Sequence, residues 1–95
     1  MAIMKPPEKI DGAHVVEWAW SDAPFGNVLY EDGEVAAVIH GLAICRYEGS
    51  TKIYRFSCNE HWECEQDQVY TSLELAKSEL PKQYQKVEAI WQSAV

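Results

Sequence analysis

Short segments with strand-like alternation, separated by turn residues, dominate the first 70 residues of this chain. In "HVVEWAW", residues 14–20, successive side chains alternate between two sides, which is the period of a β-strand. Pro24 and Gly26 interrupt the pattern, and Asp32-Gly33 is a strong hairpin signal because the favoured turn needs positive φ at both central positions. We therefore expect the chain to fold around an antiparallel sheet.

The strand pattern continues beyond the first hairpin. The predicted strands are 14–20, 27–30, 35–47, 52–57 and 61–70. The third is long and has His40-Gly41 in its middle, where glycine weakens pairing, so we expect a kink there. Gly49-Ser50 marks the next hairpin turn. Together the segments predict a meander of about five or six antiparallel strands.

The period changes from two to 3.6 after Tyr70. Thr71 and Glu74 have the spacing of a capping box, which predicts a helix start. Pro81 disfavours helical geometry at the residue before it, so the helix should end after two to three turns. The apolar positions at helical spacing are Leu73, Ala76 and Leu80. One short helix should therefore pack on one face of the sheet, which makes the fold class α+β.

The C-terminal segment, residues 82–92, fits two patterns. Its apolar positions at helical spacing are Tyr84, Val87 and Trp91, and its alternating ones are Val87, Ala89 and Trp91. We favour a short strand.

Length and composition limit the class of protein. A chain of 95 residues supports one core, so residues 1–95 should form one domain, with 1–12 as a lead-in. Hydrophobic residues make up 47% and aromatic residues 12%, which is too apolar for a disordered chain. There is no apolar run of membrane length and no signal peptide, so the sequence predicts a cytoplasmic protein.

The charge and the cysteines exclude further classes. A net charge of −7 without a basic cluster argues against nucleic-acid binding, which depends on Lys and Arg neutralising phosphates. The same charge is compatible with a basic protein partner. Three cysteines are an odd number, which predicts reduced thiols rather than a disulfide framework.

Three segments carry a resemblance to a known group of proteins. These are "IHGLAICRYEG", "YRFSCNEHWE" and "YTSLELAKSELPKQY". The chain resembles, over about residues 14–92, small uncharacterised bacterial proteins, some of which are carried as mobile gene cassettes in integrons. The group has no assigned activity, so the resemblance implies an α+β domain and no particular chemistry.

The segment "CNEHWECE", residues 58–65, is the strongest candidate for reactive chemistry. Cys58, His61 and Cys64 are each three residues apart, a spacing compatible with zinc ligands. If residues 59 and 60 form a two-residue turn, Cys58 pairs with His61, and Cys64 lies on the opposite face. An odd-length loop would put Cys58 and Cys64 on one face and His61 in the loop. We predict no structural metal, since no fourth ligand is evident either.

A nucleophile and base made of Cys58 and His61 would be surrounded by glutamates, which disfavour the thiolate. The carboxylates of Glu63, Glu65 and Asp67 are expected on a solvated strand face rather than in an enclosed pocket. We therefore predict no catalytic residue, no cofactor and no enzymatic activity.

The remaining hypotheses concern binding. Apolar residues on both sides of residues 14–20 and 35–44 require burial of both sheet faces, which predicts a homodimer or a protein partner on the face opposite the helix. The candidate binding residues are Trp18, Trp20, His40 and Trp62. The leading hypothesis is a protein-interaction module that self-associates or binds another protein, one version being an acidic inhibitor or immunity-type protein. The alternative is a small-molecule binder with an aromatic-lined pocket between the bent third strand and the helix.

Overall fold

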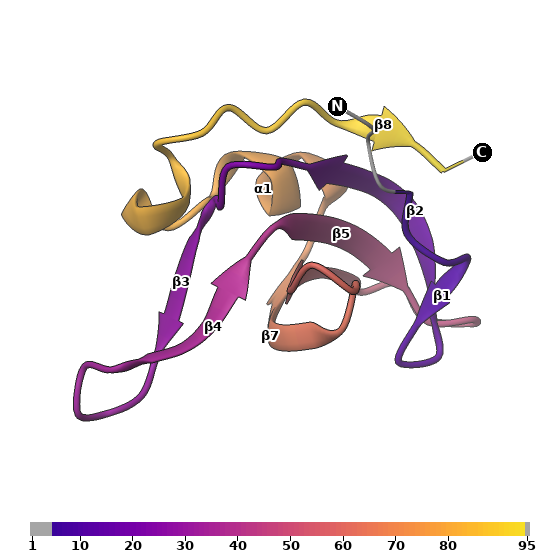
Figure 1. Cartoon of the computed structure of the whole chain (residues 1–95). Helices are drawn as coiled ribbons and strands as arrows, with labels where there is room; N and C mark the ends of the chain where they lie inside the picture. Colours follow the sequence, from indigo (N-terminus) through magenta and orange to yellow (C-terminus); the bar gives the residue numbers. More distant parts are fainter. Residues whose placement is uncertain (1–4, 95) are drawn as a thin grey trace.

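The computed structural model describes residues 5–94 and shows an α+β fold, which confirms the predicted fold class. Five strands of a curled antiparallel sheet follow the order β1-β2-β5-β6-β7, and β8 pairs with β2 as the sixth (Figure 1). The strands are β1 (Lys9–Ile10), β2 (Ala13–Trp20), β5 (Gly41–Arg46), β6 (Ile53–Cys58), β7 (Cys64–Tyr70) and β8 (Gln92–Ser93). One short helix, α1 (Leu73–Ser78), packs against this sheet.

A hairpin outside the main sheet forms a second, two-stranded sheet of β3 (Gly26–Leu29) and β4 (Val35–Ile39). We call residues 26–39 the arm, because the hairpin projects from the rest of the molecule (Figure 1). The hairpin at Asp32-Gly33 is confirmed, but not as a two-residue turn: only Gly33 has positive φ, at 89°, and a 2.8 Å bond from Tyr30 N to Glu34 O closes a loop of residues 31–33. The predicted kink is also confirmed, since β4 ends before His40 and β5 begins after it.

The order of the strands differs from a simple meander. β2 pairs with β5 rather than with β3, because the break at Pro24 leads the chain away from the sheet and the kink at His40 returns it. The predicted lead-in also contributes a strand, as Lys9 and Ile10 pair with β2. Asp11 and Gly12 form the turn between β1 and β2, with φ of 50° and 83°, the positive values that tight hairpin turns need.

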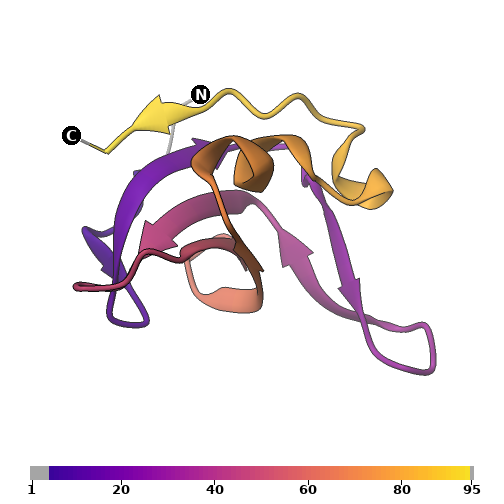
Figure 2. The same ribbon diagram turned by 180° about the vertical axis from the view of Figure 1, so that it is seen from behind.

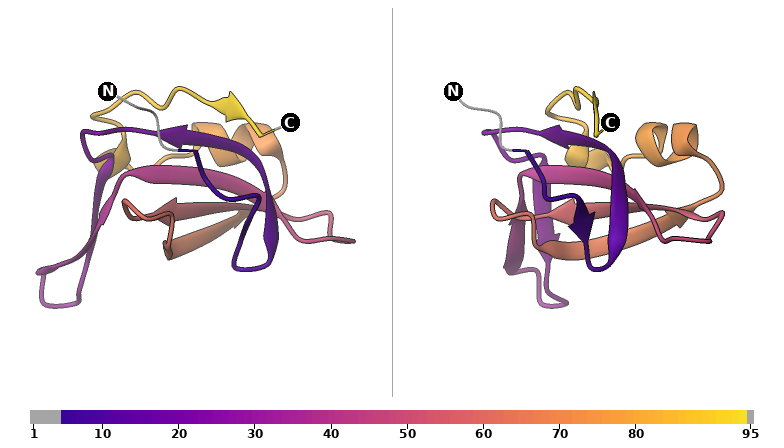
Figure 3. Two further views of the ribbon diagram at one scale, coloured as in Figure 1. Left: turned by 45° about the vertical axis from the view of Figure 1, so that its right-hand side comes forward. Right: turned by 90° about the vertical axis from the view of Figure 1, so that its right-hand side faces the viewer.

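The concave side of the sheet encloses the first of two hydrophobic clusters (Figure 3). Its buried residues are Ile10, Ala13, Val15, Trp18, Ala43, Cys45, Phe56, Cys58 and Trp62. The register of β2 against β5 shifts between Val15 and Glu17, which is a β-bulge. The bulge changes the predicted alternation, so Val15 rather than Val16 shares this cluster with Trp18.

The convex side is covered by the C-terminal part of the chain (Figure 2). The second cluster consists of Ala19, Phe25, Ile39, Leu42 and Tyr84, with Leu80, Val87, Ala89 and Trp91 among the half-buried residues against it. Residues 82–92 are largely irregular, with a 3-10 turn at Lys82–Tyr84 and a strand only at Gln92–Ser93, so the predicted strand is much shorter than expected. Lys77 of α1 binds Glu17 of β2 at 3.2 Å and ties the helix to the sheet.

Both faces of the sheet at β2 and β5 are therefore filled within one chain. Trp18 and Ala43 on the concave side are 5% and 0% exposed, and Ala19 and Leu42 on the convex side are 0% exposed. The apolar residues on both sides of β2 and β5 thus need no partner for their burial. The homodimer stays a prediction, but it has to use another surface. Within residues 5–94, no helix has the length and apolar character that a membrane crossing requires.

The helix begins one residue later than the capping-box spacing predicts. Ser72 is the N-cap, and its Oγ accepts a hydrogen bond from Leu75 N at 3.2 Å, so the prediction of Thr71 as the cap is wrong. Both residues are hydroxyl-bearing and adjacent, and the apolar spacing alone does not fix a boundary to one residue.

The N-cap makes a measurable prediction for stability. Ser72→Ala should lower the free energy of unfolding by about 0.5–2 kcal/mol, because Leu75 N loses its acceptor. Thr71→Ala is the matched control, and its midpoint in urea should stay close to that of the wild type. If Thr71→Ala lowered the free energy of unfolding more than Ser72→Ala, Thr71 rather than Ser72 would be the N-cap.

Candidate functional site

The loop between Cys58 and Cys64 is wider than the predicted two-residue turn. Cys58 lies opposite Cys64 rather than His61, so the connecting loop comprises residues 59–63. The side chain of Asn59 organises this loop, because its Oδ1 accepts hydrogen bonds from His61 N at 2.9 Å and Glu63 N at 3.0 Å. An Asn side chain that replaces backbone partners in this way is common in turns. The odd-length alternative is the one that the chain adopts.

Because the loop has five residues, Cys58 and Cys64 lie on the same side of the sheet, while His61 points to solvent. The His61 side chain is 74% exposed, and its Nε2 lies 3.7 Å from a carboxylate oxygen of Glu60. The prediction that a two-residue turn places Cys58 and Cys64 on opposite faces is therefore wrong. No cluster of three His, Cys, Asp or Glu side chains with metal-binding geometry occurs in the described part of the chain. That the loop binds no metal stays a prediction.

The three thiols are all shielded from reaction. Burial, with a smaller contribution from neighbouring acidic groups, raises the pKa of Cys64 to about 11 and that of Cys45 to about 12. Burial also raises the pKa of Cys58 strongly. The thiolate is the nucleophilic form of cysteine, so this environment opposes covalent catalysis.

The thiols should therefore react slowly and in a fixed order with iodoacetamide at pH 8. Cys64 is the half-exposed one and should be alkylated first, with a thiolate fraction roughly a few hundred times smaller than that of a free cysteine. Cys45 and Cys58 should be alkylated only on unfolding. Peptide mass mapping over time gives the order, and early modification of Cys58 would contradict the buried arrangement.

The four candidate binding residues lie side by side in one aromatic cluster. Trp62 packs edge to face on Trp18 with ring centroids 6.1 Å apart, and the Trp20 ring centroid lies 5.6 Å from that of Trp62. The His40 ring stacks on Trp20 at 5.7 Å, and its Nδ1 is 2.9 Å from the Ser21 carbonyl oxygen. Trp18 and Trp62 are buried, and only Trp20 and His40 retain accessible surface. Most of this cluster is thus hydrophobic core rather than a ligand surface.

The arm carries a large part of the exposed apolar surface. Leu29 is 56%, Tyr30 61% and Val35 51% exposed, and Val38 is 37% exposed. A two-stranded hairpin is marginally stable by itself, and this one is anchored at its base by Phe25 and Ile39, which are buried against Tyr84. The base of the arm is therefore fixed while its apolar tip projects into solvent.

Acidic residues surround this apolar surface. Glu31, Asp32 and Glu34 at the tip form no ion pair within residues 5–94. Along β4, a concavity of about 460 Å³ separates the arm from the 59–65 segment. Val35 and Val38 line one side of this concavity, and Glu60 and Glu65 line the other. The arm and its surroundings thus combine exposed apolar residues with negative charge, which at the tip has no ion-pair partner among the described residues.

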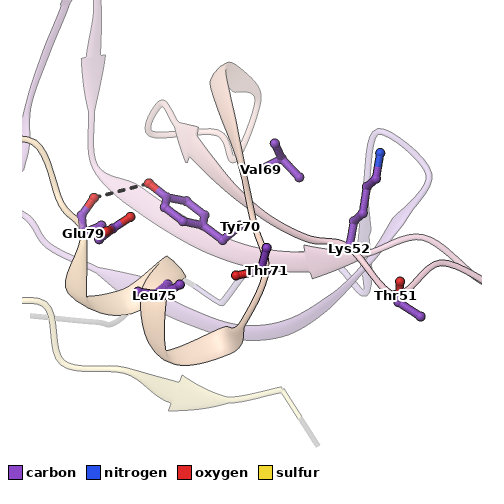
Figure 4. A pocket seen from close by; sticks show the side chains of 7 residues that line it. All are labelled: Thr51, Lys52, Val69, Tyr70, Thr71, Leu75 and Glu79. Atoms are coloured by element: carbon purple, nitrogen blue, oxygen red, sulfur yellow. Dashed lines mark hydrogen bonds between the residues drawn. The ribbon is translucent and has the colours of Figure 1, made fainter.

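A separate groove of about 660 Å³ lies between the β5–β6 turn, the end of β7 and the helix (Figure 4). Val69 and Leu75 give it an apolar surface, and both side chains are substantially exposed. Tyr70 also lines the groove and donates a hydrogen bond from its hydroxyl to the Glu79 carbonyl oxygen at 3.2 Å (Figure 4). Lys52 lies at the other end of the groove.

A buried arginine that the sequence analysis missed supports this groove from beneath. Arg55 is 4% exposed, and its Nη1 donates to the carbonyl oxygens of Ala76 at 3.1 Å and Glu79 at 3.0 Å. Its guanidinium group also lies over the Tyr70 ring, 5.1 Å from the centroid. The sequence feature that could have indicated a buried arginine is its position between Tyr54 and Phe56 in a predicted strand.

Comparison with known proteins adds no family to these observations. No family model, no curated protein and no solved structure matches the chain. The resemblance to integron cassette proteins therefore stays a prediction, and the surfaces described above are the basis for any functional assignment.

Proposed function

We propose that this protein is a non-enzymatic protein-interaction module, and that the arm is its principal docking element. The observation that carries the proposal is the projecting hairpin with four exposed apolar residues, Leu29, Tyr30, Val35 and Val38. Scattered exposed apolar residues are ordinary, whereas several on one anchored projection are typical of an interaction site. Tyrosine in particular is enriched in protein interfaces.

The charge of the arm favours a basic partner. Glu31, Asp32 and Glu34 have no cation to neutralise them within the described residues, and Glu60 and Glu65 face the arm across the concavity. Complementary charge accelerates association and selects partners more than it increases affinity. The partner should therefore present an apolar site with Lys or Arg around it, and the complex should weaken as salt increases.

The absence of enzymatic activity is part of the proposal. The thiols have raised pKa values, and the exposed His61 has only Glu60 beside it rather than a nucleophile. A cytoplasmic location, predicted from the sequence, is consistent with three free cysteines.

A photo-crosslinking amino acid tests the arm directly. Placed at Tyr30 in cells, it should form a covalent adduct with one basic protein, whereas the same group at Tyr47, an exposed tyrosine at the opposite end of β5 from the arm, should not. The adduct is identified by mass spectrometry, and the partner is then purified. Its affinity for the protein should fall with salt and should be lost in a Leu29→Ser, Tyr30→Ser variant.

Each result decides the proposal. Equal adducts from positions 30 and 47, or a purified partner that binds the arm variant as well as the wild type, would reject the arm as the docking element. An affinity that is the same at low and high salt would reject the basic partner, but the arm would remain the docking element.

The groove beside β7 supports a second candidate function, binding of a small molecule. Its volume of about 660 Å³ lies within the range of known ligand sites, and Tyr70 with Val69 and Leu75 gives it apolar character. This differs from the pocket expected between the bent third strand and the helix, since none of Trp18, Trp20 and Trp62 lines the groove. Native mass spectrometry of protein taken from cells tests the candidate, because a retained ligand adds its mass to that of the chain.

A further inference from the structure

β7 forms a long edge of the main sheet. It is the last strand in the order β1-β2-β5-β6-β7, and no strand pairs with its outer side within residues 5–94. Residues 65–69 are all exposed, so neither face of this stretch is covered. An edge strand presents unpaired N–H and C=O groups that can template another strand. The opposite edge differs, since β1 has only two residues.

The two halves of β7 are protected to different degrees. Near Cys64 a register shift against β6 disturbs the strand, and Glu65 adds a charge, two devices that limit pairing at an edge. The half from Gln68 to Tyr70 has neither a register shift nor a charged residue. It ends at the apolar groove, where Val69 is 50% and Leu75 39% exposed. This half of the edge is therefore open to another strand.

Charge is distributed unevenly along the same edge. Glu65 lies toward the N-terminal end of β7, and Asp67 lies at its middle. Lys52 lies at the groove beside the C-terminal end, because Ile53, the next residue, pairs with Tyr70. The Lys52 ammonium group forms no ion pair within the described residues. A strand that runs antiparallel to β7 and carries the same charges would bring Glu65 of each copy toward Lys52 of the other, with Asp67 near the middle of the pair.

A second copy of β7 meets this requirement, whereas a parallel copy would place like charges together. We propose that the protein forms a two-fold symmetric dimer in which β7 of one protomer pairs antiparallel with β7 of its partner, with the axis near Gln68. The two sheets then form one continuous sheet. With this register Glu65 lies opposite the partner's Thr71 and near the partner's Lys52, and the interface is the same on both sides, as a two-fold axis requires.

The dimer shares with the proposed function only the premise that the protein is an interaction module. It uses the β7 edge rather than the arm, so either can fail without the other. It also replaces the sheet face as the surface for the homodimer that the sequence predicts. A single pair of edge strands buries little apolar area, so the dimer should be weak and in exchange with the monomer.

Charge reversal with rescue tests the pairing. Sedimentation equilibrium across the micromolar range should show a monomer–dimer equilibrium for the wild type. Lys52→Glu should raise the dimer Kd about tenfold, because two symmetry-related ion pairs are replaced by repulsion. Glu65→Lys should weaken the dimer similarly, and the double variant should recover the wild-type Kd. Lys82→Glu, which makes the same charge change away from the edge, should have little effect.

Cysteine cross-linking provides a second readout that does not depend on Glu65, which also accepts a hydrogen bond from Asn59. With oxidised glutathione, the thiols of two Gln68→Cys protomers should lose their hydrogens and form one intermolecular disulfide, while two glutathione thiols are released. Gln66→Cys lies off the axis and should not cross-link. A wild type that sediments as a monomer at every concentration, a double variant that fails to recover, or equal cross-linking at positions 66 and 68 would each overturn the proposal.

Discussion

Trp62→Ala should lower the free energy of unfolding by about 3–5 kcal/mol, the usual cost of removing a large aromatic side chain from a core. Trp62 is 6% exposed although it lies in a loop, and it packs between Trp18 and Trp20. Its removal leaves both rings without their shared neighbour. Urea unfolding followed by tryptophan fluorescence measures the loss. His61→Ala, the exposed neighbouring position, should stay within about 0.5 kcal/mol of the wild type.

Gly41 provides an internal check on this packing. A Cβ atom at Gly41 would lie 2.6 Å from the Trp62 ring, so Gly41→Ala should overpack the core and cost about 1–3 kcal/mol. In the Trp62→Ala background the ring is absent, and most of that cost should disappear. Strict additivity of the two substitutions would show that the Trp62 ring does not lie on Gly41.

The sequence predicted those parts of the fold that depend on local chemistry. The hairpin at Asp32-Gly33 and the kink at His40-Gly41 follow from residues that adopt, or permit, unusual backbone geometry, and both are present. The helix also begins within one residue of its predicted start, but it ends at Ser78, before Leu80, and its six residues are fewer than the predicted two to three turns. In each case the signal and the structure that it predicts lie within a few residues of one another.

What the sequence did not show depends on contacts between distant segments. The pairing of β2 with β5 leaves β3 and β4 to form the arm, and no local pattern distinguishes this from a meander. The bulge at Val16 changes which β2 residues face the concave core. The loop after Cys58 is set by the side chain of Asn59 in place of a two-residue turn.

The candidate binding residues illustrate the same limit. Trp18, Trp20, His40 and Trp62 do come together, but an aromatic residue on a strand gives no sign of whether it will be enclosed. Enclosure depends on the curl of the sheet, which buries Trp18 and Trp62. The exposed apolar residues of the arm were assigned to ordinary strands, because their exposure follows from the topology.

Arg55→Met should lower the free energy of unfolding by about 2–4 kcal/mol, although it replaces a charged core residue by an apolar one of similar length. The guanidinium group supplies hydrogen bonds to Ala76 O and Glu79 O at the end of α1, where helix carbonyls lack intrahelical partners and carry partial negative charge. Methionine can fill the space but cannot donate. Ala76 O would then lose its Arg55 donor, and Glu79 O would keep only the Tyr70 hydroxyl of its two side-chain donors.

The loss should be largest at the helix. With six residues, α1 is too short to be stable in water by itself, and Arg55 is its polar link to β6. Amide hydrogen exchange in Arg55→Met should therefore accelerate more in α1 than in β2 or β5. Arg46→Met, at an exposed arginine of β5, is the matched control and should leave both stability and exchange near the wild type. A stability of Arg55→Met equal to that of Arg46→Met would mean that α1 is held by its apolar contacts alone, and that the Arg55 hydrogen bonds contribute nothing net.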